Sequence, residues 1–95
     1  MIHRVEISRF AEKQLRKIPQ HIRKKLQIWV QSVEDLGLEA VRKSPGYHDE
    51  PLHGRLVGKR SIRLNDAYRA IYVIKKNGSV EFVNIEEVNK HEYKK

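Results

Sequence analysis

The first third of the chain has a hydrophobic pattern that predicts one short strand followed by a helix. Residues 2–7 place Ile2, Val5 and Ile7 among polar neighbours, in a run short enough for a strand. Ser8 is suited to cap a helix over about 9–17, because its hydroxyl can accept a hydrogen bond from a free helix amide. Pro19 should end this helix. Its expected core-facing residues are Phe10, Ala11, Leu15 and Ile18.

A second, longer helix is predicted over about 20–36, where apolar residues recur every three or four positions. Gly37 is placed where a helix commonly ends in a left-handed residue. Residues 38–43 are expected to add a helical turn. The apolar stripe consists of Ile22, Leu26, Trp29 or Val30, Val33 and Leu36.

The pattern changes to strands after the break at Ser44-Pro45-Gly46. Strands are predicted at about 52–57, 59–64, 68–75 and 79–86, with a hairpin turn at Lys76-Asn77-Gly78. We therefore expect a single α+β domain over residues 1–95. In it the N-terminal strand and two helices pack on one face of a small antiparallel sheet, and the other face stays open.

Charge and composition limit the partners and the kinds of site that fit this chain. Twenty Lys/Arg against twelve Asp/Glu give a formal charge of +8, which favours nucleic acid or a compensating acidic protein as partner. The chain has no cysteine, which excludes disulfides and thiolate metal sites. No apolar run approaches the roughly 20 residues that cross a bilayer. We expect a soluble, cytoplasmic protein with no membrane partner.

Basic side chains gather in the stretch 49–72, DEPLHGRLVGKRSIRLNDAYRAIY. Strand alternation puts Ser61 and Arg63 on one face, and Arg69 stands on the next strand after a turn at Asn65-Asp66-Ala67. Arginines on adjacent strands form a fixed guanidinium array that suits phosphates. The same pattern is also typical of a basic, solvent-exposed face of an antiparallel sheet that binds no ligand.

Acid–base chemistry beside these arginines is the reaction that the residue types allow. The histidines His3, His21, His48, His53 and His91 lack metal-ligand spacing, and no phosphate loop or nucleophile elbow is present, so we expect no metal and no cofactor. Metal-free RNA cleavage needs a base for the 2′-OH, an acid for the leaving 5′-oxygen and cations for the phosphorus. Glu50 or His48 is the candidate base and His91 the candidate acid. Arg69 and Arg63 are the candidate cations, and Tyr93 can stack on a base or orient the phosphate.

The same stretch resembles the central signature of the RelE/ParE toxin superfamily, most closely its RelE and YoeB branch. The resemblance lies in Glu50-Pro51-Leu52, a basic glycine-containing hairpin, Ser61-Ile62-Arg63-Leu64 and Tyr68-Arg69-Ala70-Ile71-Tyr72. The terminal Lys90-His91-Glu92-Tyr93 is similar to the His and Tyr that close several members.

This resemblance implies a toxin of a type II toxin–antitoxin pair, held inactive by an antitoxin protein and cleaving mRNA at the ribosome when free. It implies Glu50 as base, Arg69 as transition-state cation and His91 as acid, with Tyr93 as a further catalytic residue. It implies that Arg63 and the Lys59/Arg60 pair hold flanking phosphates, and we count His53 and Arg55 with them as candidate RNA-binding residues. His53 is also suited to be a second proton carrier or only a solvated residue. One departure is the longer tail before His91, which needs a turn for the imidazole to reach Arg69.

Two other functions fit the same sequence. One is a gyrase-inhibiting toxin of the ParE type, which does not need the acid–base set. The other is a nucleic-acid-binding module without catalysis.

Overall fold

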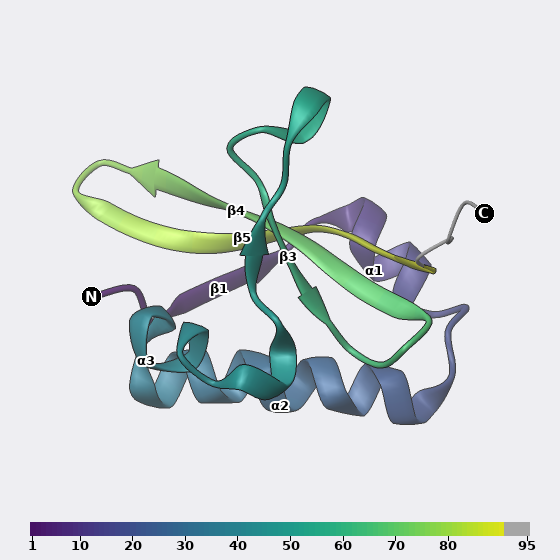
Figure 1. Cartoon of the computed structure of the whole chain (residues 1–95). Helices are drawn as coiled ribbons and strands as arrows, with labels where there is room; N and C mark the ends of the chain where they lie inside the picture. Colours follow the sequence, from purple (N-terminus) through teal and green to yellow (C-terminus); the bar gives the residue numbers. More distant parts are fainter. Residues whose placement is uncertain (91–95) are drawn as a thin grey trace.

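The computed structural model describes residues 1–90, whose helices lie on one side of a single sheet (Figure 1). The helices are α1 (Arg9–Leu15), α2 (Gln20–Leu36) and α3 (Leu38–Arg42). The strands are β1 (Arg4–Ile7), β2 (Glu50–Pro51), β3 (Arg60–Arg63), β4 (Tyr68–Asn77) and β5 (Val80–Lys90). Two 3₁₀ turns, η1 (Pro45–Tyr47) and η2 (Gly54–Leu56), flank β2.

The five strands follow the order β1-β5-β4-β3-β2. The pairs from β2 to β5 are antiparallel, as predicted, while β1 runs parallel to β5, with Arg4 opposite Phe82 and Ile7 opposite Ile85. The sheet is therefore mixed rather than purely antiparallel, because the chain crosses from β1 to the remaining strands through its helices. The predicted α+β class, with helices over one face of a small sheet, is confirmed.

Side chains at both ends of α1 join this helix to β5 beyond the end of β1. The Ser8 hydroxyl accepts a hydrogen bond from the Ala11 amide and donates one to the Glu86 carbonyl, each at 3.0 Å. The Gln14 side-chain oxygen accepts from the Val88 amide at 2.6 Å. These bonds satisfy strand-edge groups that have no further strand beside them.

The core lies between α2 and the sheet. Ile22, Leu26, Trp29 and Val33 of α2 are buried, and the Trp29 ring lies 5.4 Å from the ring of Tyr72 on β4. Helix α2 ends at Gly37, whose φ of 88° is costly for any residue with a side chain. The predicted bounds of α2 are confirmed.

Three predictions about individual segments are wrong. Residues 52–57 form no strand: η2 and the left-handed Gly54 bend them into a loop that rises on the side away from α2 in Figure 1. Phe10 and Leu36 are exposed instead of buried, because Ala11 and Leu38 fill the core at those turns of the chain.

Candidate functional site

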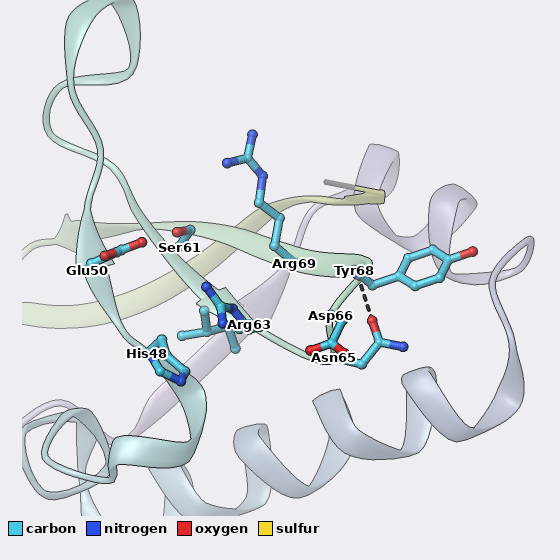
Figure 2. A pocket seen from close by; sticks show the side chains of 9 residues that line it. His48, Glu50, Ser61, Arg63, Asn65, Asp66, Tyr68 and Arg69 are labelled. Atoms are coloured by element: carbon cyan, nitrogen blue, oxygen red, sulfur yellow. Dashed lines mark hydrogen bonds between the residues drawn. The ribbon is translucent and has the colours of Figure 1, made fainter. Parts of the chain in front are cut away.

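A pocket of about 50 Å³ opens at the β2–β3 edge of the sheet (Figure 2). It is enclosed by the segment 48–50, by β3 and by the turn that leads into β4. The polar side chains that line it are those of His48, Glu50, Ser61, Arg63, Asn65, Asp66, Tyr68 and Arg69.

The cationic part of the pocket comes from two arginines on neighbouring strands. Arg63 of β3 is directly opposite Arg69 of β4. Ile62 and Ala70 beside them belong to the core, so alternation puts both arginines on the other, open face. The Arg69 Nε donates a long bond of 3.5 Å to the Asn89 side-chain oxygen on β5. The array predicted from the sequence is therefore present on the open face.

The turn between β3 and β4 fixes the position of this arginine pair. The Asn65 side-chain oxygen accepts hydrogen bonds from the Ala67 amide at 2.8 Å and from the Tyr68 amide at 2.7 Å, and Figure 2 shows the second of these bonds. The Leu64 amide donates to the Tyr68 carbonyl at 2.9 Å. An asparagine that closes a turn in this way sets the strand register, and with it the Arg63–Arg69 pairing.

The acidic part of the pocket is Glu50, which begins the edge strand β2. Glu50 is paired with Ser61 in the sheet register, and its exposed side chain extends toward Ser61 in Figure 2. This arrangement places a carboxylate and two guanidinium groups around one pocket, as the candidate base and cations require.

His48 lies on the same pocket, below Glu50 in Figure 2. It has φ 47° and ψ 50°, a left-handed conformation that is uncommon for residues other than glycine. Among residues 1–90, it is the only histidine that lines the pocket. The sequence offered His48 as an alternative base, but it carried no sign of this conformation.

Asp49, between these two pocket residues, points the other way. Its carboxylate accepts hydrogen bonds of 2.6 Å from the Arg60 Nε and 2.6 Å from the Tyr72 hydroxyl, and its side chain is 1% exposed. Burial, and then the bond to Asp49, raises the pKa of the Tyr72 hydroxyl. This buried cluster was not anticipated from the sequence.

The remaining residues predicted to bind RNA do not line the pocket. The Arg60 guanidinium is engaged by Asp49, and the Lys59 Nζ lies 2.8 Å from a carboxylate oxygen of Glu86. The hydrogen bond and charge of Glu86 raise the pKa of Lys59. His53 and Arg55 are exposed on the loop that carries η2.

His91 and Tyr93 lie outside the described residues. The described chain ends on β5 with Asn89 opposite Arg69 and Lys90 opposite Tyr68, so it reaches the arginine side of the pocket. Within residues 1–90 no group of His, Asp and Glu side chains is arranged to hold a metal ion. No helix in that part of the chain is both long and apolar enough to span a membrane.

Comparison with known proteins identifies the fold. No protein-family model matches the sequence, and no curated protein matches it. Among solved structures, a YoeB/ParE toxin from Agrobacterium tumefaciens superposes with a TM-score of 0.70 at 13% identity, covering 94% of this chain and 99% of that one. The YoeB dimer from Staphylococcus aureus gives a TM-score of 0.67 at 20% identity, covering 98% and 100%.

An archaeal RelE–RelB complex from Pyrococcus horikoshii contains a further similar chain, with a TM-score of 0.64 at 24% identity, covering 95% of this chain and 96% of that one. These structures match the chain over nearly its whole length. The expected architecture is thereby confirmed: this chain has the fold of the RelE and YoeB toxins.

Proposed function

We propose that the protein is the toxin of a type II toxin–antitoxin pair and an endoribonuclease that cleaves mRNA at the ribosome. The observation that carries the proposal is the meeting of Glu50 with Arg63 and Arg69 around one pocket on the open sheet face. The fold shared with RelE and YoeB toxins supports it. So does the net charge of +8, which favours a polyanionic substrate.

The reaction needs only groups that the protein supplies. Glu50, or His48 beside it, takes the proton of a ribose 2′-OH, and the resulting oxygen attacks the adjacent phosphorus. Arg69 balances the additional negative charge on the phosphoryl oxygens. The bond to the 5′-oxygen breaks as an acid, assigned to His91 by resemblance, protonates it. The products are a 2′,3′-cyclic phosphate and a free 5′-OH.

Binding of the flanking RNA falls to side chains around the pocket. Arg63 is exposed beside Arg69 and is suited to the neighbouring phosphate. His53 and Arg55 extend the basic surface onto the loop with η2. Lys59 and Arg60 already have carboxylate partners, so their part in RNA binding is through net charge unless those ion pairs open.

An antitoxin protein is the proposed protein partner, in a cytoplasmic complex. Solved relatives include a YoeB–YefM complex and a RelE–RelB complex. In this chain a groove of about 570 Å³ runs between α1 and α2, with Leu15, Leu26 and Val30 along it and Arg16 and Arg23 beside them. An acidic amphipathic segment would match both its apolar floor and its charge.

The test uses the purified chain with ribosomes translating a defined message, followed by primer extension to map the broken ends. We expect breaks within codons, and an Arg69→Ala variant that is folded by circular dichroism and at least about 100-fold slower. Arg9→Ala, at an exposed arginine on α1, is the matched control and should cleave normally. Intact transcripts with relaxed plasmid DNA in cells would instead indicate a gyrase-inhibiting toxin. Salt-sensitive RNA binding without breaks would indicate a binding module.

A further inference from the structure

The segment 48–50 joins the pocket to the core through one buried carboxylate. Strand β2 has only two residues, which pair as Glu50–Ser61 and Pro51–Arg60 with β3. One further backbone bond, from the Leu52 amide to the Lys59 carbonyl at 2.9 Å, follows the strand. Proline has no amide hydrogen to offer to a further strand, so β2 stays at the edge of the sheet. A segment held by so few ladder bonds needs another attachment if its side chains are to keep one orientation.

Asp49 supplies that attachment. Its two carboxylate oxygens each accept one short bond, from the Arg60 Nε and the Tyr72 hydroxyl, both at 2.6 Å. A second Arg60 nitrogen also contacts the Asp49 carbonyl at 3.4 Å. Tyr72 is itself held against Trp29 of α2, with 5.4 Å between the rings. The attachment therefore reaches from the edge strand to the centre of the core.

The direction of this attachment determines where the neighbouring side chains point. Arg60 is paired with Tyr72, and Tyr72 belongs to the core face of the sheet. With Asp49 turned to that face, alternation turns Glu50 to the opposite one, where it is paired with Ser61 on the pocket wall. His48 precedes Asp49 in a left-handed conformation that surrounding contacts must maintain.

We propose that Asp49 is a positioning residue, which holds Glu50 and His48 toward the pocket by binding Arg60 and Tyr72 on the other side of the chain. The structural part of this proposal stands by itself, and its catalytic consequence rests on the proposed function. If Asp49 only stabilised the fold, loss of its hydrogen bonds would lower the free energy of unfolding and leave the cleavage rate unchanged. If Asp49 positions Glu50, loss of the same bonds also lowers the cleavage rate.

A double-mutant cycle with Glu50 separates these two cases. Tyr72→Phe removes only the hydroxyl that binds Asp49, and Arg60→Lys removes the Nε bond while keeping the charge. We expect Tyr72→Phe to slow single-turnover cleavage by about 10- to 100-fold, the range in which misplaced catalytic groups fall. Combined with Glu50→Gln, the same change should have little further effect. An equal loss with and without Glu50 would overturn the coupling.

A second measurement does not depend on cleavage. ¹⁵N relaxation of the amides of residues 48–50 should show lower order parameters in Tyr72→Phe and Arg60→Lys than in the wild type. Tyr47→Phe is the matched control, since it removes a tyrosine hydroxyl near the same segment without touching Asp49, and should leave those values unchanged. Unchanged order in both test variants would overturn the positioning role. A wild-type chain that never cleaves RNA would remove the proposed function, and the relaxation data would then decide the structural claim.

Discussion

Arg63 and Arg69 are directly opposite each other on β3 and β4, so two like charges form one cross-strand pair. Such pairs destabilise a sheet by several tenths of a kcal/mol, up to about 1 kcal/mol. Hydrophobic or oppositely charged residues would stabilise the same position. An anion bound between the two guanidinium groups would offset this repulsion.

The first prediction therefore concerns anion binding. Inorganic phosphate or a short RNA should raise the Tm of the wild-type chain, because a ligand that binds only the folded state stabilises it. In low salt without phosphate, Arg63→Gln and Arg69→Gln should each raise the Tm slightly by removing the repulsion. Both variants should then lose most of the response to phosphate. Differential scanning calorimetry measures both effects, and Arg9→Gln controls for total charge. An equal phosphate response in all three variants would argue against a specific site.

The second prediction concerns Glu50. Glu50→Gln keeps the size of the side chain and removes its charge at an exposed position, so the free energy of unfolding should change by less than about 0.5 kcal/mol. Single-turnover cleavage should fall by about 10²- to 10⁴-fold, because a carboxamide cannot take the 2′-OH proton. His48→Gln, measured in parallel, shows which of the two groups removes the proton. If Glu50→Gln is active and His48→Gln is not, the histidine is the base.

The third prediction is a loss of stability in alkaline solution. The pKa of Tyr72 is raised in the folded protein, so above about pH 10 the unfolded chain loses this proton before the folded chain does. The unfolded state then binds fewer protons, and the free energy of unfolding falls as pH rises, by at most about 1.4 kcal/mol per pH unit for one group.

Lys59 acts in the same direction, since its pKa is raised by Glu86 and the stabilisation is lost as pH rises through that raised pKa. Urea titrations between pH 8 and 11, a range set by these ordinary pKa values of about 10 to 10.5, measure the slope. Tyr72→Phe and Lys59→Met should each make it shallower. A slope that is identical in the wild type and both variants would mean that neither group contributes.

The fourth prediction concerns the groove between α1 and α2. Val30→Asp places a carboxylate on its apolar floor, where burial under a partner is unfavourable and an acidic partner is repelled. Binding of the proposed antitoxin protein should weaken by about tenfold or more, equivalent to about 1.4 kcal/mol, as measured by isothermal titration calorimetry. Ile28→Asp on the same helix, at an exposed position that does not line the groove, is the control. Equal weakening by both would place the antitoxin elsewhere.

Much of the helical part and of the arginine array was predictable because local signals decide them. Pro19 and Gly37 mark both ends of α2, and one apolar stripe runs between them. The side to which Arg63 and Arg69 point follows from strand alternation together with the turn at Asn65. These features depend on residues that are close in sequence.

The features that escaped prediction depend on the backbone conformation of single glycines or on contacts between distant residues. Leu52, Leu56 and Val57 look like strand residues, but the positive φ at Gly54 and Gly58 bends the segment away from the sheet. The buried bonds of Asp49 join positions that are 11 and 23 residues apart. Nothing in the sequence of the four polar residues Tyr47, His48, Asp49 and Glu50 indicates which side chain is buried, since each can also be exposed to water.

The parallel pairing of Arg4 with Phe82 means that the sheet joins the earliest and latest parts of the described chain. During translation, β1 leaves the ribosome long before its partner β5 has been synthesised. The nascent chain therefore has no complete sheet, and Asn89 is not yet available to contact Arg69. The arginine side of the pocket is therefore complete only after β5 has left the ribosome and paired with β4 and β1.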